Sequence, residues 1–179
     1  MAQAVQEPKF LGLLPLWYSV AIGFVSCVLR CFALLYIVCF YNNITFAGVH
    51  FYAEIQCAVA SLGLLGPPLS ILAGFGTLFG VSAHVKTFSL YLKALAIVDC
   101  VIFLALLLAA GLCEELAHDV LIVRSPAFVC LFVHIGFFFW GIVGVALDMY
   151  LAMAVGQKAE AILRLEKIRE PWKFPLSQA

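Results

Sequence analysis

The stretch PAFVCLFVHIGFFFWGIVGVALDMYLAMAV, residues Pro126 to Val155, decides the fold class because it is long and apolar enough to cross a membrane. Within it, Ala127 to Leu147 comprises 21 residues whose only ionisable side chain is His134. At a rise of about 1.5 Å per residue, a helix of this length spans a hydrocarbon core of ~30 Å. We therefore predict a transmembrane helix that leaves the membrane at Asp148.

The charges beyond this helix predict which side of the membrane it reaches. Half of the chain's ten Lys and Arg residues follow Asp148, and membrane proteins concentrate such residues on the cytoplasmic side. In our assignment Lys9, Lys86 and Lys93 share that side, and Arg124 alone lies on the other. Both termini are therefore expected on the positive, cytoplasm-like side. The bases that follow Asp148 are Lys158, Arg164, Lys167, Arg169 and Lys173.

The composition of the whole chain is that of an integral membrane protein. Hydrophobic residues make up 65% of its 179 residues and charged residues 11%, against about 25% charged in soluble domains. The net charge is zero, so nothing indicates nucleic-acid binding. The expected location is multi-pass in a membrane, either an organellar inner membrane or an endomembrane or plasma membrane.

Apolar periodicity and length predict an all-α membrane protein with four transmembrane helices. Residues 1–155 form this four-helix domain together with a short N-terminal tail. Tyr41 to Phe51 is expected to be a short loop, and His84 to Lys93 a short polar connection. The predicted spans are roughly Leu14 to Phe40, Tyr52 to Ser82, Leu92 to Leu112 and Ala127 to Leu147.

The second span carries a break and a glycine-rich half. Pro67 and Pro68 follow Gly66, and two consecutive prolines remove two backbone donors, so the helix is expected to kink or break there. Small residues let membrane helices approach closely. Three glycines after the break are therefore expected to form a smooth packing face, either within the bundle or as a homodimer seam. They are Gly74, Gly76 and Gly80.

Residues 156–179 are predicted to form an amphipathic tail. Leu165, Ile168 and Trp172 recur at helical spacing and form an apolar stripe too narrow for a span. A freely solvated helix would not need such a stripe. The tail is therefore expected to dock on a partner protein or to lie on lipid headgroups.

Ionisable residues within the spans are the sharpest signal of a site, because the bilayer tolerates them only when they are buried, paired or able to reach the interface. Positions counted from the predicted span ends place Arg30, Glu54 and His134 in the outer half of the membrane, where they form a polar cluster. Structural pairing of Arg30, a lipid or partner contact, and a transport role all remain open. Asp99 and Asp148 fall in the inner half, with Asp99 near Lys93 or Lys86.

The seven cysteines predict neither a metal centre nor a catalytic site. No CxxC pair occurs, the four histidines are scattered, and no phosphate-binding loop or nucleophile motif is present. We expect no enzyme activity and identify no cofactor, although bound lipids are expected. Disulfide bonds are expected only if the outer side is oxidising. The candidate cysteines flank the two outer loops: Cys39, Cys57, Cys113 and Cys130.

The layout resembles that of MARVEL-like and lysosomal-type four-span membrane proteins. Four features carry this resemblance: Lys9 leading directly into Leu11 to Gly23, four spans with both ends inside, a tight turn between spans two and three, and cysteines around the last outer loop. The resemblance implies membrane organisation or trafficking without catalysis.

Two function classes follow from the sequence. The first is a non-catalytic membrane protein that packs with other integral membrane proteins and with lipids. It would serve as an accessory subunit of a larger, for example bioenergetic, complex or as a membrane organiser. The alternative is a small transporter or channel that uses Arg30 and the broken second helix, since interrupted helices often mark transporter sites.

Overall fold

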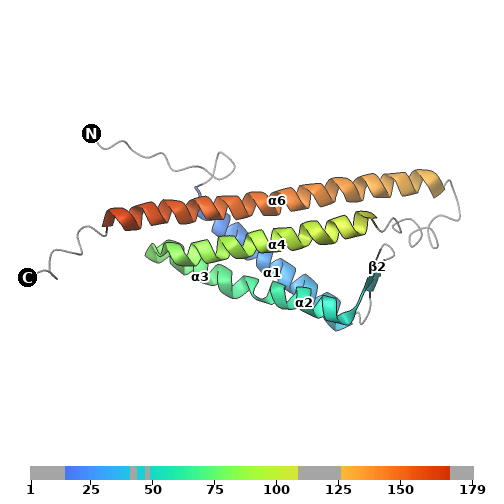
Figure 1. Cartoon of the computed structure of the whole chain (residues 1–179), viewed down its shortest axis with the longest axis horizontal. Helices are drawn as coiled ribbons and strands as arrows, with labels where there is room; N and C mark the ends of the chain where they lie inside the picture. The colour runs from blue at the N-terminus through green and yellow to red at the C-terminus, as the bar shows by residue number, and fades with distance from the viewer. Residues whose placement is uncertain (1–14, 41–43, 47–48, 109–125, 170–179) are drawn as a thin grey trace, which may run out of the picture.

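A computed structural model of the chain describes residues 15–40, 44–46, 49–108 and 126–169 (Figure 1). Four helical stretches in this part are long and apolar enough to cross a membrane: Trp17–Phe40, Ala53–Phe79, Ser82–Leu108 and His134–Ile168. The predicted all-helical, multi-pass architecture is confirmed at this level. The elements in chain order are α1 (Trp17–Phe40), β1 (Ile44–Phe46), β2 (Val49–Phe51), α2 (Ala53–Leu64), α3 (Gly66–Phe79), α4 (Ser82–Leu108) and α6 (Pro126–Arg169).

Helices α4 and α6 lie side by side and form the most extensive helix pair (Figure 1). Ser89 of α4 is buried, and its hydroxyl donates a hydrogen bond of 3.0 Å to the carbonyl oxygen of Ala152 in α6. A Cβ atom at Gly156 would lie 3.1 Å from that hydroxyl, so a larger residue there would have to displace Ser89 by a few tenths of an ångström. Close contact between small residues is the usual way in which membrane helices associate.

The core lies where α4 and α6 meet the start of α1. Phe88, Val85 and Val155 are fully buried there, together with Leu16 at the entrance to α1. A Cβ atom at Gly23 of α1 would approach the ring of Phe88 to 3.1 Å. Ala73 of α3 belongs to the same cluster, so the core joins all four spans.

The second span is interrupted at Leu65, between α2 and α3. Pro67 and Pro68 occupy the first turn of α3, where backbone N–H groups have no acceptor within the helix. The carbonyl oxygen of Leu62, close to the interruption, accepts a 2.9 Å hydrogen bond from the hydroxyl of Tyr91 in α4. A Cβ atom at Gly66 would lie 2.9 Å from the same hydroxyl. The interruption is therefore packed against a neighbouring helix, whose Tyr91 gives the Leu62 carbonyl a second donor beside the N–H of Leu65.

The three glycines of α3 do not share the predicted packing face. Gly80 ends the helix with φ 72°, and the N–H of Val81 closes the turn on the carbonyl oxygen of Gly76 at 2.8 Å. A Cβ atom at Gly76 would lie 2.9 Å from the Cβ of His84, whereas one at Gly74 would meet no atom within 4 Å. Only Gly76 makes a close helix contact, because Gly74 faces outward and Gly80 is a helix cap.

Two connections differ from the prediction. The predicted loop Tyr41 to Phe51 contains an antiparallel hairpin that pairs Ile44 with Phe51. The predicted polar connection His84 to Lys93 is the first part of α4, which begins at Ser82. Its polar residues hid the helical spacing of three buried residues: Val85, Phe88 and Leu92.

The far end of the α4–α6 pair provides a test of glycine packing. A side chain at Gly141 would collide with the ring of Phe103, whereas a Cβ atom at Gly144, one turn along α6, would meet nothing within 4 Å. Overpacking of this kind costs about 1–3 kcal/mol. We expect Gly141→Ala to lower the unfolding midpoint in detergent or bicelles. Gly144→Ala is the matched control and is expected to leave the midpoint unchanged or raise it; equal midpoints for the two variants would contradict the packing of Phe103.

Candidate functional site

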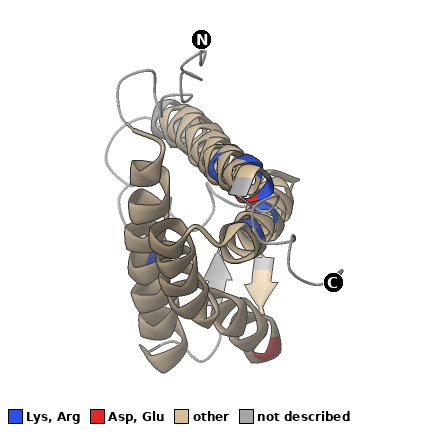
Figure 2. Cartoon of the chain, turned by 90° about the vertical axis from the view of Figure 1, so that its left-hand side faces the viewer, with Lys and Arg blue, Asp and Glu red and all other residues tan. Residues whose placement is uncertain are grey.

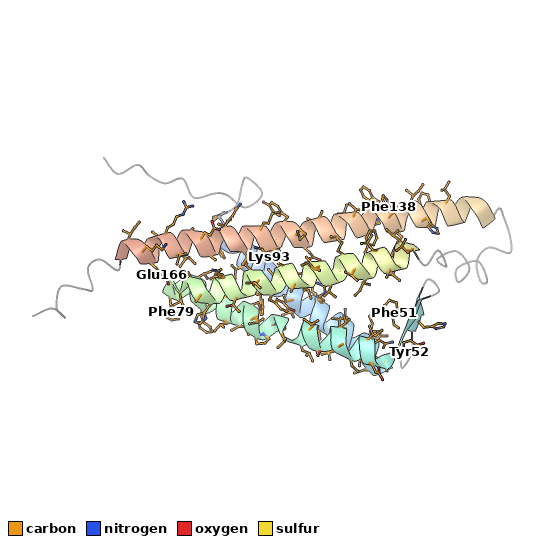
Figure 3. The ribbon with its side chains drawn as sticks, in the orientation of Figure 1. Phe51, Tyr52, Phe79, Lys93, Phe138 and Glu166 are labelled. Carbon is orange, nitrogen blue, oxygen red and sulfur yellow. The ribbon has the colours of Figure 1, made fainter. Side chains whose placement is uncertain are left out.

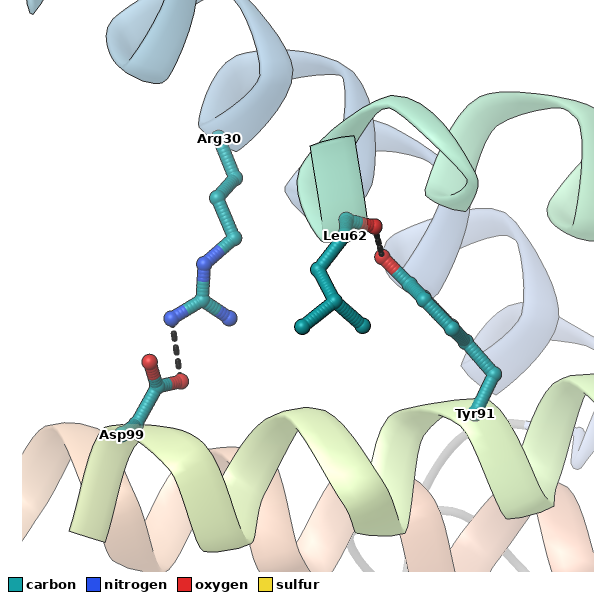
Figure 4. A network of polar contacts seen from close by, with 4 residues as sticks. All are labelled: Arg30, Leu62, Tyr91 and Asp99. Carbon is teal, nitrogen blue, oxygen red and sulfur yellow. Dashed lines mark hydrogen bonds and ion pairs between the residues drawn. The ribbon is translucent and has the colours of Figure 1, made fainter. Parts of the chain in front are cut away.

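An ion pair between Arg30 and Asp99 joins α1 to α4 inside the bundle (Figure 4). Arg30 lies near the middle of α1, and its guanidinium contacts the carboxylate of Asp99 directly. The side chains are 27% and 19% exposed, so both are largely withdrawn from the surface. Isolated charges in a membrane are costly, and pairing within the bundle removes most of that cost. The pair therefore fixes the level of α1 against α4.

Helix α6 adds a third charged residue to this centre. Asp148, midway along α6, lies within electrostatic reach of both Arg30 and Asp99. The buried Cys27, one turn before Arg30 on α1, lies close to the same group. Three helices thus each contribute one charged side chain, and we call Arg30, Asp99 and Asp148 the charged centre.

The charged centre lies next to the interruption of the second span (Figure 4). Tyr91 lies two turns before Asp99 on α4, and its hydroxyl donates to the carbonyl oxygen of Leu62 at the end of α2. Asp99 binds Arg30 from the same helix. One face of α4 therefore binds both a charge from α1 and a backbone carbonyl at the end of α2.

The predicted cluster of Arg30, Glu54 and His134 is corrected by this arrangement. Glu54 lies exposed on the first turn of α2, and no described residue forms an ion pair with it. His134 precedes Asp148 by 14 residues of continuous helix, which is ~21 Å along α6. The ion-pair partner of Arg30 is Asp99. The sequence predicts Asp99 in the opposite half of the membrane, near Lys93 or Lys86.

The error in depth has a physical cause. Helix α4 begins at Ser82 and not near Leu92, so Asp99 lies 17 residues from its start and not a turn or two inside. Helix α6 continues through Asp148 to Arg169, so Asp148 lies midway along a helix and comes within electrostatic reach of Arg30.

A signal for this site is nonetheless present in the sequence. In each helix the charged residue continues a row of buried residues at helical spacing. Arg30 follows Val20, Gly23 and Cys27 on α1; Asp99 follows Phe88, Leu92 and Leu95 on α4; Asp148 precedes Leu151, Ala152 and Val155 on α6. A helical-wheel projection of each helix would have placed all three charged residues on the side that faces the interior.

The predicted disulfide cysteines are only partly described. Cys39 and Cys57 are both exposed and free. Cys113 and the side chain of Cys130 lie outside the described part of the chain. Among the described residues, no group of three His, Cys, Asp or Glu side chains is arranged to hold a metal ion.

The tail residues divide into a docked row and an exposed row. Ala159 and Ile162 are buried, and Glu166 accepts hydrogen bonds from the backbone N–H and the hydroxyl of Ser82, at 3.0 and 2.5 Å. This carboxylate lies at the N-terminus of α4, where a helix favours negative charge. Leu165 and Ile168, predicted to dock, are exposed. Trp172 lies outside the described residues.

The chain matches no protein-family model, and comparison with curated proteins and with solved structures likewise gives no match. The charged centre must therefore be interpreted from its own geometry.

The ion pair makes a quantitative prediction about stability. Arg30→Leu leaves the Asp99 and Asp148 carboxylates without a cation, and breaking a buried pair costs about 3–5 kcal/mol. We expect a loss of roughly this size in unfolding experiments in bicelles. Arg30→Leu combined with Asp99→Leu should restore part of the loss, because one carboxylate is then left unpaired where the single variant leaves two.

Arg164→Leu is the control for this measurement. Arg164 is an exposed residue of α6 and is expected to change stability by less than about 1 kcal/mol. An Arg30→Leu variant as stable as Arg164→Leu would show that the pair does not hold α1 in place.

Proposed function

We propose that the protein is a non-catalytic integral membrane protein that packs with other membrane proteins and with lipids, as an accessory subunit of a larger complex or a membrane organiser. The observation that carries the proposal is the division of the molecule into an inward charged centre and an outward apolar surface. The intramembrane charges Arg30 and Asp99 form an ion pair with each other. The four spans present large apolar side chains outward.

All four spans expose large apolar side chains. Phe32 of α1 is 68% exposed, Leu78 of α3 80%, Leu104 of α4 51% and Trp140 of α6 71%. In water such a surface would aggregate, but in a membrane it meets lipid chains or the helices of other proteins. This surface therefore supports a packing role.

One cavity in the described part of the chain supports lipid packing. Three cavities in the described part of the chain are lined by other residues, and Arg30, Asp99 and Asp148 line none of these three. The most apolar of the three, of about 380 Å³, lies between α1, α2 and α4 and is lined by Leu34 and other apolar residues together with Gln56. An apolar cavity facing the membrane suits a lipid chain better than a solute.

One observation favours the alternative, a small transporter or channel. The ion pair of Arg30 and Asp99 adjoins the interrupted second span at Leu65, and transporters place their sites at such interruptions. Solute flux into liposomes that disappears in Arg30→Leu, while the protein remains folded, would favour this alternative.

The orientation in the membrane is part of the proposal. In the described part of the chain, every Lys and Arg except Arg30 lies in the first half of α4 or the later part of α6, and Figure 2 shows them on these two helices. The hydrogen bonds between Ser82 and Glu166 bring these two parts to the same end of the molecule. The positive-inside tendency assigns this end, and with it both termini, to the cytoplasm-like side.

Cysteine labelling in sealed vesicles tests this orientation. In a variant without native cysteines, Thr87→Cys on α4 and Leu165→Cys on α6 should react with an impermeant reagent from one face of the membrane. Tyr52→Cys, between β2 and α2, should react from the other face, because α2 and α3 together make one crossing. Reaction of Thr87→Cys and Tyr52→Cys from the same face would contradict the four-span topology.

The exposed row of the tail is proposed to bind a partner protein. Leu165 and Ile168 are 60% and 68% exposed and lie beyond the last buried residue of α6, Ile162. We expect Leu165→Ser combined with Ile168→Ser to lose at least one protein that co-purifies with the chain from its native membrane in mild detergent. Mass spectrometry of the co-purified proteins provides the measurement.

Lys167→Ser is the matched control, because it changes an exposed polar residue between the two apolar positions. It should retain every partner. If the double variant also retains every partner, the tail surface faces lipid and the partner-binding part of the proposal is wrong.

A further inference from the structure

A groove opens between the first half of α4 and the later part of α6, at the end of the molecule opposite the hairpin. Its volume is about 490 Å³, and the hydrogen bonds from Ser82 to Glu166 tie its two walls together. Figure 3 labels Lys93 and Glu166 on these two helices. The lining residues used below are Ala83, Lys86, Leu90, Lys93, Glu160 and Leu163.

The depth of the groove follows from the charged centre. Arg30 lies near the middle of α1, so its partner Asp99 lies near the middle of the membrane. Lys93 precedes Asp99 by six residues and Lys86 by thirteen, which places their Cα atoms at ~9 and ~20 Å from that level. The hydrocarbon edge lies at ~15 Å, so the two lysines bracket it.

The aromatic residues of α1 mark the same level independently. Trp17 and Tyr18 open α1 about thirteen residues before Arg30, or ~20 Å away, and their rings stack with centroids 3.9 Å apart. Tryptophan and tyrosine concentrate at the membrane–water interface. The groove therefore lies at the depth of the lipid headgroups.

The chemistry of the groove selects an anion that carries apolar chains. Lys86 and Lys93 are both exposed, and neither forms an ion pair with a described residue. Glu160 on the opposite wall is the one acidic lining residue, so a single positive charge remains in excess. Leu90 and Leu163 supply an apolar wall beside these charges. A phosphate between two ammonium groups, with acyl chains running toward the membrane centre, satisfies both features.

We propose that this groove binds the headgroup of an anionic glycerophospholipid from the positive leaflet. Its phosphate lies between Lys86 and Lys93, and its acyl chains follow Leu90 toward the membrane centre. The inference deepens the proposed function, since it names the class of lipid and the place where it binds. A soluble phosphate would use the two lysines alone, whereas the lipid also uses the apolar wall.

The test is native mass spectrometry of the full chain in detergent, with phosphatidylglycerol and phosphatidylcholine as probes. We expect phosphatidylglycerol to bind at least tenfold more tightly than phosphatidylcholine. Lys86→Gln combined with Lys93→Gln should abolish this preference. Lys167→Gln removes an exposed base of α6 that does not line the groove, and it should retain the preference.

A steric variant separates the groove from general surface charge. Ala83→Phe fills the groove without changing its charge and should weaken phosphatidylglycerol binding at least fivefold, with the unfolding midpoint recorded to show that the protein remains folded. Equal loss in Lys167→Gln and in the double lysine variant, or full binding in Ala83→Phe, would overturn the proposal. Displacement of the lipid by millimolar inorganic phosphate would overturn it also, because the site would then be one for free anions.

These outcomes are independent of the partner experiment. Lipid binding is measured on the isolated chain, whereas the proposed packing role is measured by co-purification from the native membrane. If the unchanged chain shows no preference for phosphatidylglycerol while the Leu165→Ser, Ile168→Ser variant still loses a partner, the lipid site alone is rejected. If the lipid preference is found while that variant retains every partner, the tail surface alone is rejected.

Discussion

The cost of a charge within a membrane is the constraint on which the rest of this structure depends. The guanidinium of Arg30 lies inside the bundle and forms an ion pair with Asp99 of α4. Asp148 of α6 lies within reach of both, so α1, α4 and α6 are brought to a common level by groups that the bilayer does not solvate. Helices joined only by apolar side chains can shift along one another at little free-energy cost in lipid. A charged side chain fixes the relative height of two helices, because it must stay beside its partner.

Close packing then acts around this fixed level. Gly23 admits the ring of Phe88, Gly66 admits the hydroxyl of Tyr91, and Gly156 admits the hydroxyl of Ser89. Each contact joins a glycine of one helix to a larger α4 side chain, so α4 is the helix against which the others are arranged. The association of the spans depends on this fit, because lipid provides no hydrophobic driving force between helices.

The number and approximate position of the spans could be predicted from the sequence because each is a long apolar run bounded by polar residues. The charged centre could not be predicted by counting residues from span ends, since such counts inherit any error in the ends. Polar residues between His84 and Lys93 concealed a helix whose buried side, including Val85 and Phe88, faces other helices. Periodicity would have been a better guide than polarity, as the position of Asp99 in line with Leu92 and Leu95 shows.

The tail shows a second limit of prediction from sequence: spacing alone does not tell which of two apolar rows is buried. Leu165 and Ile168 were predicted to form the apolar row that docks, but the row buried within the molecule is a different one, with Ala159 and Ile162. Both rows have helical spacing. Which of them is covered depends on where α4 begins, and that is a long-range property of the fold.

The length of α6 has a mechanical consequence. Its 44 residues extend over ~66 Å, which exceeds the ~40–45 Å of a bilayer with its headgroups. A single unbroken helix that crosses the membrane and continues beyond it is a stiff rod, and α4 braces it through the contact of Ser82 with Glu166. A force applied to its protruding end would tilt the whole rod. The rod would transmit this load to α4 and to the buried core around Phe88 and Val155.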